Sequence, residues 1–223
     1  TALNEPVSRI FVPYLHSVLI TMETLAKSPV MLYTEQTPNP ETLKFVLNRI
    51  LYKGIADFKQ ADQAFDWSPF ASALFEFPFV KGVYMCNNFV TITKEGAVEW
   101  NDIMLELKEY IKSWIADDKP IIAEGYQAYM DQQEKDNSTI QYSEADAELV
   151  KRIKELIETY VKPAVEMDGG NIEFKAFDQG TVYVIMQGSC SGCPSSTVTL
   201  KAGIEGMLKR MIPEVKEVVS EMG

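Results

Sequence analysis

The stretch of sequence that decides the fold is residues 161–196, VKPAVEMDGGNIEFKAFDQGTVYVIMQGSCSGCPSS. Apolar residues alternate with other residues in 171–177 and again in 181–187, which is typical of half-buried β-strands. The residues between them, 178–180 (Asp-Gln-Gly), favour a tight turn because glycine tolerates positive φ. We therefore predict a β-hairpin that leads directly into a loop with two cysteines.

Amphipathic helices are expected on both sides of this hairpin. The upstream helix begins near Ser143, whose hydroxyl can cap it, and ends at Asp168-Gly169-Gly170. The downstream helix follows the cysteine loop and ends before Pro213, and 215–219 forms a final strand. The apolar stripes of the two helices are Leu149, Ile153, Leu156, Ile157 and Tyr160, and then Leu200, Ile204, Met207, Leu208 and Met211. The pattern predicts a small α+β domain of α-β-β-α-β order.

The loop between the hairpin and the second helix, Gly188 to Pro194 (GSCSGCP), carries the chemistry. Cys190 and Cys193 are three positions apart, so both thiols can turn toward one point, and Gly192 allows the tight backbone that this needs. Pro194 suits a first helical turn because its missing N–H has no partner there. A helix N-terminus lowers the pKa of a nearby thiol. The loop is therefore expected to bind metal or to exchange disulfides.

Several chemistries fit two cysteines at this spacing. The cysteines could simply pack in the hydrophobic core. However, the glycine between them and the proline and serines after them are not typical of a core segment. A thioredoxin-like dithiol oxidoreductase also places CxxC between a strand and a helix, although its fold needs more strands and a parallel βαβ unit before the motif. A zinc site needs two further ligands. The other histidine and cysteine, His16 and Cys86, are far away in sequence.

An iron–sulfur cluster resolves the shortage of ligands. A cubane cluster takes four thiolates and one domain supplies two. Two identical chains can each donate Cys190 and Cys193, an arrangement natural for a symmetric homodimer. A cluster at the surface between subunits is assembled and released easily, which suits a carrier better than an electron-transfer protein.

The chain before residue 115 shows a different mixed α and β pattern. Residues 31–35 and 42–47 are expected to be strands on either side of a Pro-Asn-Pro turn. The runs 83–86 and 89–93 predict a second hairpin across Asn87-Asn88, because asparagine tolerates positive φ. Both hairpins therefore belong to small sheets in separate domains.

A helix is expected to cover this N-terminal hairpin, with the apolar stripe Ile103, Leu107, Tyr110, Ile111 and Trp114. Cys86 is expected as a half-buried strand residue, and His16 as a satisfied or solvent-facing side chain rather than a ligand. The nearby aromatic residues are expected mainly in the core, with a recognition surface as the alternative. They are Phe65, Trp67, Phe70, Phe75, Phe77 and Phe79.

Hydrophobic periodicity fades in residues 116–143, which indicates a boundary between two domains. This stretch holds six acidic and two basic residues, and a linker that repels itself stays extended. Ile122, Tyr126 and Tyr129 lie at helical spacing, however, and could form a docking helix instead. The predicted organisation is an N-terminal extension at 1–29, a first α+β domain at 30–115, this acidic linker, and the C-terminal domain at 144–223.

The composition excludes several classes of function. The 223 residues carry a net charge of -11, so nucleic acid is not an expected partner. No apolar run approaches the roughly 18 to 20 residues of a membrane-spanning helix, so no membrane association is expected. Three cysteines do not form a disulfide framework, which indicates a reducing compartment. Because no targeting segment is evident, a cytoplasmic location is expected, with a mature organellar protein as the alternative.

The motifs resemble those of NifU-like (Nfu) proteins. Residues 144–223 are similar to the C-terminal NifU-like domain, with its DGG turn, its hairpin and its GxCxxCPSS loop followed by TxTLKxGIE. In the first domain, TEQTPNPETLKF at 34–45 and NNFVTITK at 87–94 resemble the Nfu N-terminal module. Cys86 has no counterpart in the family pattern.

The resemblance implies an iron–sulfur cluster scaffold or carrier and not an enzyme. It implies that Cys190 and Cys193 bind a 4Fe-4S cluster, with a 2Fe-2S form as the alternative, and that the cluster bridges a homodimer or higher oligomer. The implied partners are upstream cluster-assembly proteins and the apo iron–sulfur proteins that receive the cluster.

Overall fold

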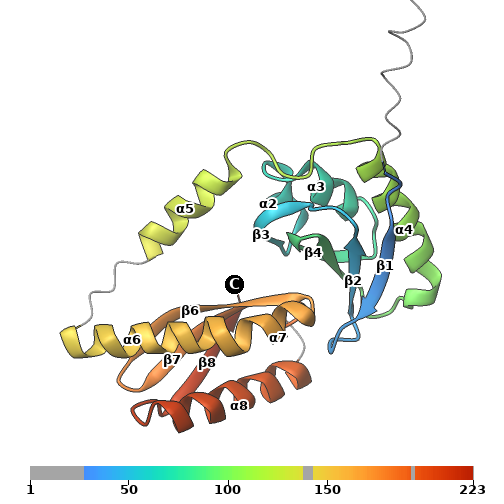
Figure 1. The fold of residues 1–223 in the computed structure, drawn as a ribbon. Helices are drawn as coiled ribbons and strands as arrows, with labels where there is room; N and C mark the ends of the chain where they lie inside the picture. Colours follow the sequence, from blue (N-terminus) through green and yellow to red (C-terminus); the bar gives the residue numbers. More distant parts are fainter. Residues whose placement is uncertain (1–27, 138–142, 192–193, 223) are drawn as a thin grey trace, which may run out of the picture.

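The computed structural model describes residues 28–137, 143–191 and 194–222. Within them the chain forms two α+β domains, which lie one above the other in Figure 1. His16 falls outside the described residues. None of the described helices has the length and apolar character needed to cross a lipid bilayer.

The first domain contains a five-stranded antiparallel sheet with the strand order β1-β2-β5-β4-β3. The hairpin across Asn87 is confirmed, and this residue has a φ of 49°. The elements of the domain are β1 (Leu32–Gln36), β2 (Thr42–Leu47), β3 (Tyr52–Phe58), α2 (Ala61–Phe65), α3 (Pro69–Phe75), β4 (Val80–Asn87), β5 (Phe89–Lys94) and α4 (Trp100–Ala116).

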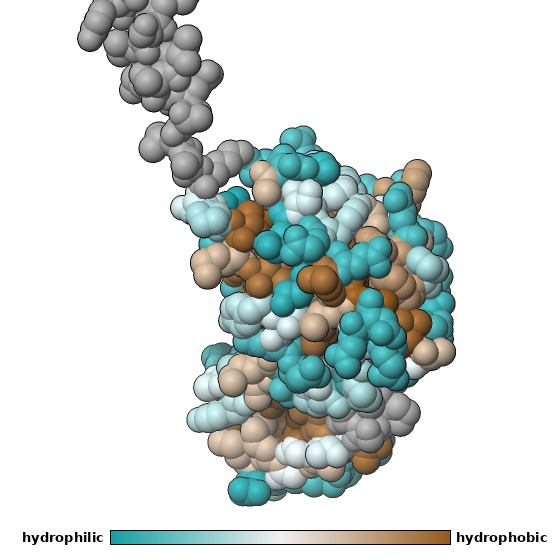
Figure 2. Space-filling model, turned by 90° about the vertical axis from the view of Figure 1, so that its right-hand side faces the viewer, coloured by the Kyte–Doolittle hydropathy of each residue, from teal (hydrophilic) through white to brown (hydrophobic). Residues whose placement is uncertain are grey.

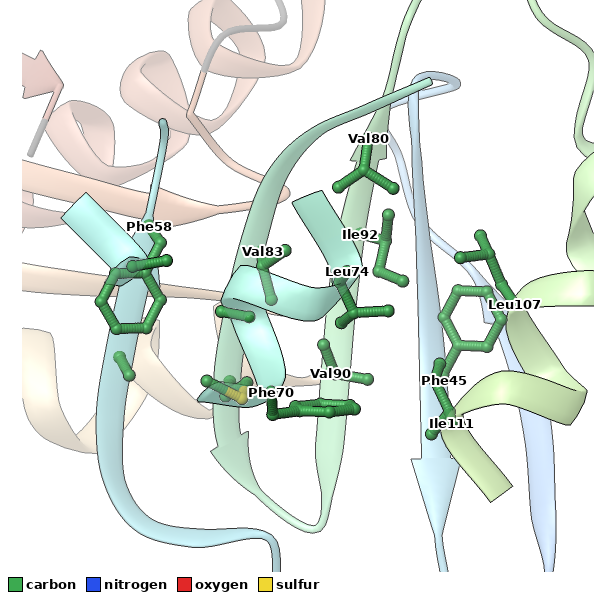
Figure 3. Close-up of a cluster of buried hydrophobic side chains, with 14 of the residues drawn as sticks. Phe45, Phe58, Phe70, Leu74, Val80, Val83, Val90, Ile92, Leu107 and Ile111 are labelled. Atoms are coloured by element: carbon green, nitrogen blue, oxygen red, sulfur yellow. The ribbon is translucent and has the colours of Figure 1, made fainter. Parts of the chain in front are cut away.

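The main core of this domain lies between the sheet and the helices α3 and α4. Alternate residues of β2 point to opposite faces of the sheet. Phe45 therefore joins Leu107 and Ile111 of α4 in the core, as Figure 3 shows. Lys44 and Val46 point to the other face, which faces the second domain.

Residues 51–79 contain the elements that sequence periodicity does not predict, β3, α2 and α3. They are short, and α3 is fixed by its start: the Ser68 hydroxyl accepts the Ala71 N–H at 3.0 Å, and a proline occupies the first turn. Phe70 is fully buried, and Trp67, Phe75, Phe77 and Phe79 pack against the same core, as expected. The expectation is wrong for Phe65, which is 78% exposed because it ends α2 on the outside.

The stretch between the domains contains the helix α5 (Tyr126–Asn137). Tyr126 is buried among the rings of Tyr52, Phe58 and Trp67, and Tyr129 stacks on Trp67 with the ring centroids 4.6 Å apart. Of the two alternatives for this stretch, the structure has the docking helix. The extended form is wrong for these residues, because the buried tyrosine holds the helix against the first domain.

The second domain has the predicted α-β-β-α-β order around a sheet of three strands, β6-β7-β8. The hairpin β6–β7 is antiparallel, whereas β8 pairs parallel to β7 after the crossover helix. The Ser143 hydroxyl accepts the Asp146 N–H, so the predicted cap is confirmed. The elements are α6 (Glu144–Leu156), η1 (Ile157–Val161), α7 (Lys162–Met167), β6 (Gly170–Asp178), β7 (Thr181–Gly188), α8 (Pro194–Met211) and β8 (Glu217–Met222).

A π-helical turn, η1, interrupts the first helix of this domain. It ends at Val161, two residues before Pro163, whose ring would clash with the Thr159 carbonyl in a regular α-helix. The extra residue turns the helix face, so Tyr160 is 60% exposed and does not belong to the predicted apolar stripe. The final strand begins at Glu217, two residues later than predicted.

Figure 2 views the molecule from the side of β1 and α4, where the two domains form one continuous body. Hydrophilic residues cover most of this face, with hydrophobic residues among them in small groups.

Candidate functional site

The cysteine loop starts at the end of β7 and leads into α8. Gly188 is the last residue of β7 and has a φ of 64°, a region that favours glycine. Ser189 and Cys190 follow it, and the helix starts at Pro194 as expected. Cys193 lies outside the described residues, so its role stays a prediction.

Hydrogen bonds fasten this loop to the turn between α7 and β6. The Ser189 hydroxyl donates to the Asp168 carbonyl oxygen at 2.5 Å, and the Ser189 N–H donates to the Gly169 carbonyl oxygen at 3.2 Å. The Ser191 hydroxyl donates to the Gly188 carbonyl oxygen at 2.9 Å. The Asp-Gly-Gly turn therefore positions the cysteine loop, although the two motifs are far apart in sequence.

The Cys190 thiol is packed inside this frame and the residue is only 6% exposed. A methyl group on Gly170 would lie 2.9 Å from Cys190 Sγ and 2.6 Å from the Gln187 carbonyl oxygen. Real side-chain carbons do not approach a backbone oxygen this closely, so glycine is required beside the thiol. The Ser189 hydroxyl lies 3.7 Å from Cys190 Sγ, within hydrogen-bond range for sulfur.

Burial raises the pKa of the Cys190 thiol; the hydrogen bond with Ser189 lowers this pKa and the charge of Asp168 raises it. The expectation that the helix N-terminus lowers the thiol pKa is therefore wrong for Cys190 in this arrangement. Desolvation of a thiolate outweighs the helix dipole when the sulfur is covered. The thiolate that a metal needs is favoured only when Cys190 becomes more exposed or when a cation binds it.

Side chains of the first domain reach the Asp-Gly-Gly turn, which frames this loop, from the sheet face that points away from α3 and α4. Thr91 Oγ1 donates to the Gly169 carbonyl oxygen at 2.8 Å, and the Tyr84 hydroxyl donates to the Gly170 carbonyl oxygen at 3.4 Å. The sequence does not predict these contacts. The signal that could have found them is the run of polar residues at alternate positions of β2 and β5, on a face that the structure buries.

Cys86 is a strand residue, as predicted, but it is buried rather than half-buried, with 4% of its surface exposed. It shares with Tyr84 the face of the sheet that meets the second domain. Burial raises the pKa of the Cys86 thiol, a hydrogen bond with Tyr84 lowers it, and the nearby charge of Glu166 raises it. Cys86, the cysteine outside the loop, therefore lies at the junction of the domains.

A cavity of about 110 Å³ lies at the same junction, beside Ser191 and Gly188 of the loop. Tyr84 and Asp57 line it from the first domain. The Asp57 Oδ2 oxygen is buried and has no hydrogen-bond partner among the described residues. Desolvation raises the pKa of the Asp57 carboxyl group to about 6, although Lys59 and a hydrogen bond from the Gly188 backbone lower it.

Two protein-family models match this chain. Residues 153–219 match the NifU-like domain, and residues 32–118 match the N-terminal domain of Nfu/NifU scaffold proteins. A protein of Drosophila sechellia named NFU1 iron-sulfur cluster scaffold homolog, mitochondrial, is 38% identical over 201 residues, which are 89% of this chain and 68% of the relative. The chain belongs to the Nfu family. It contains both domains of that family, the Nfu N-terminal domain and the NifU-like domain.

Other Nfu proteins are similar over the same length. The Drosophila willistoni protein of the same name is 41% identical over 199 residues, covering 88% of this chain and 65% of the relative. NifU-like protein 4, mitochondrial, of Arabidopsis thaliana is 38% identical over 195 residues, covering 86% and 66%. The chain thus spans about two thirds of the length of these relatives.

Both Nfu domains contribute to the site just described. Cys190 and Cys193 lie in the part that matches the NifU-like domain, while Tyr84 and Thr91 lie in the part that matches the Nfu N-terminal domain. Across the described residues, no group of three or more His, Cys, Asp or Glu side chains is arranged to hold a metal ion.

Proposed function

We propose that this Nfu protein carries a 4Fe-4S cluster that two copies of the chain hold between them, each through Cys190 and Cys193. The construction of the loop is the observation that carries the proposal. The Ser189 hydroxyl fastens the loop by donating to the Asp168 carbonyl oxygen, and the helix α8 begins at the end of the loop, at Pro194. One loop supplies two thiolates and a cluster takes four. A 2Fe-2S cluster takes the same number and is the alternative cargo.

The cluster would be passed to an apoprotein by exchange of thiolates on iron. A thiolate of the acceptor forms a sulfur–iron bond, the bond from iron to Cys190 or Cys193 breaks, and the released thiolate takes up a proton. No electron is transferred in this exchange. Burial raises the pKa of the Cys190 thiol in the metal-free arrangement, so a released sulfur that returns to this arrangement is favoured in its protonated form.

The proposed partners follow from the cargo. Upstream cluster-assembly proteins would supply the cluster and apo iron–sulfur proteins would receive it, and the chain would act as a carrier without catalytic turnover. The relatives are named as mitochondrial proteins. We therefore favour the organellar location over the cytoplasmic one.

Dithiol exchange of the thioredoxin type is the competing function. It requires a reactive thiolate of low pKa, whereas burial raises the pKa of the Cys190 thiol. The antiparallel hairpin β6–β7 before the loop also differs from the parallel unit of that fold. The metal-free protein is accordingly expected not to reduce the disulfides of insulin.

Anaerobic reconstitution with iron and sulfide tests the ligand assignment. Cys190→Ala and Cys193→Ala should each abolish the cluster, because two chains then offer only two thiolates. Cys86→Ala is the matched control and should retain the full iron and sulfide content. Full cluster content in either loop variant, or its loss in the control, would overturn the assignment.

A further inference from the structure

One face of the five-stranded sheet is buried although no helix of its own domain covers it. We call it the docking face and define it as Lys44, Tyr84, Cys86, Phe89 and Thr91. Its apolar members form a cluster separate from the main core of the domain. Antiparallel sheets commonly leave one face to water, but here the second domain takes the place of water.

The docking face donates hydrogen bonds to the turn that frames the cysteine loop. Lys44 Nζ donates to the carbonyl oxygens of Glu166 at 3.2 Å and Met167 at 3.1 Å. Thr91 Oγ1 donates to the Gly169 carbonyl oxygen at 2.8 Å. The acceptors are the carbonyls at the end of α7 and in the turn after it, so the first domain holds the Asp-Gly-Gly turn directly.

The first domain also contacts the cysteine loop itself. Asn39 Nδ2 donates to the Ser189 carbonyl oxygen at 3.4 Å. On the other side of the loop, a methyl group on Gly188 would lie 2.8 Å from the Tyr84 ring. These contacts fall on Gly188 and Ser189, directly before Cys190, whose side chain packs in the core of the second domain. The docking face therefore acts on the thiol through the turn and the loop that it holds in place.

The contact is of a kind that can separate. Its hydrogen bonds run from side chains to backbone carbonyls, and water can replace each donor. With the two domains in contact, the Asp57 Oδ2 oxygen is also buried beside the cavity without a hydrogen-bond partner among the described residues, which is unfavourable. Polar contacts between domains of one chain allow relative movement.

We propose that this arrangement is a closed form in which the docking face withholds Cys190 from iron and from a second copy of the chain. The inference rests on the proposed function, because two copies can share a cluster only if their cysteine loops face each other. The docking face occupies the place that the second loop needs. Cluster binding therefore requires the docking face to release the loop, and the released face becomes accessible to solvent.

Alkylation of Cys190 in the metal-free full-length protein tests the cover. Lys44→Met with Thr91→Val removes the donors while keeping the size of both side chains. This double variant should be alkylated by iodoacetamide at Cys190 about tenfold faster than the unaltered protein or more, because two hydrogen-bonding side chains no longer favour closure. Lys53→Met, at an exposed position of the same sheet, is the matched control and should leave the rate unchanged. Equal rates in the unaltered protein and the double variant would contradict the proposal.

A second measurement uses the unaltered protein and does not depend on a variant that folds. The Lys44 amine, whose side chain is 10% exposed, should react slowly with an acylating reagent in the metal-free form and several times faster once the cluster is bound. The Lys53 amine should react equally in both forms. A Lys44 rate that stays the same after cluster binding would overturn the proposed release.

The two proposals fail in different ways. If no cluster forms, the carrier function fails, while the alkylation rates still report whether the loop is covered. If a cluster forms between two chains while metal-free Cys190 is alkylated as fast as in the double variant, the closed form fails and the carrier function stands.

Discussion

At the scale of single residues, the cysteine loop depends on glycine where the chain passes close to the thiol. Gly170→Ala places a methyl group 2.6 Å from the Gln187 carbonyl oxygen and 2.9 Å from Cys190 Sγ. We expect a loss of about 1 to 3 kcal/mol in the free energy of unfolding and a lower cluster content. Gly206→Ala in α8 is the control, because nothing lies within 4 Å of the added methyl group. It should raise stability by about 0.5 to 1 kcal/mol. Urea denaturation and iron analysis measure both; equal effects of the two substitutions would contradict this packing.

Asp57 should make stability depend on pH. Its carboxyl pKa is raised by burial to about 6, above the ordinary value of about 3.9 in an unfolded chain. The stabilisation linked to the bound proton is fully present below about pH 4 and is lost as the pH rises through about 6. Asp57→Asn should remove this component and should be more stable than the unaltered protein at pH 7 by about 1 to 3 kcal/mol. Denaturation at pH 5 and pH 7 measures the difference. The same pH dependence in both proteins would argue against a buried carboxylate.

At the scale of elements, sequence predicts what local periodicity encodes. The stripe of α4, the cap at Ser143 and the turn at Asn87 follow from spacing and from φ preferences, and all three are confirmed. The helices α2 and α3 are too short for a period to be visible. The π turn before Pro163 requires knowledge of where the helix must bend.

For the candidate site too, local sequence predicts one part and not the other. The position of Cys190 between a strand and a helix follows from the sequence around it. Its burial does not, because the residues of its core cluster, such as Ile153 and Val165, come from elements far away in the chain and meet only in the folded molecule. The prediction of a lowered thiol pKa fails for this reason: a local rule about helix ends does not include the burial of the sulfur in the core of the second domain.

The helix α5 should contribute to the stability of the first domain through one residue. Tyr126 packs against Tyr52, Phe58 and Trp67, so Tyr126→Ala should lower the free energy of unfolding by about 2 to 4 kcal/mol. Tyr160→Ala is the same substitution at a residue that is 60% exposed and should change it by about 0.5 kcal/mol or less. Thermal or chemical denaturation compares them. A loss at Tyr126 no larger than at Tyr160 would mean that the helix does not dock in solution.

At the scale of the whole molecule, the chain combines the cysteine loop, for which we propose cluster binding, with a sheet face of the first domain that contacts it. The proposed closed form would reconcile the buried thiol of Cys190 in the metal-free chain with its proposed role as a ligand in the loaded one. The two states differ in which surface faces the loop, its own sheet or a second copy. The account therefore depends on the stoichiometry of the loaded form.

Native mass spectrometry of the anaerobically reconstituted protein measures that stoichiometry most directly. The account predicts a species with the mass of two chains and one 4Fe-4S cluster, which falls back to single chains when the cluster is removed. A cluster bound by one chain alone, or chains that bind no cluster at any iron and sulfide concentration, would contradict it.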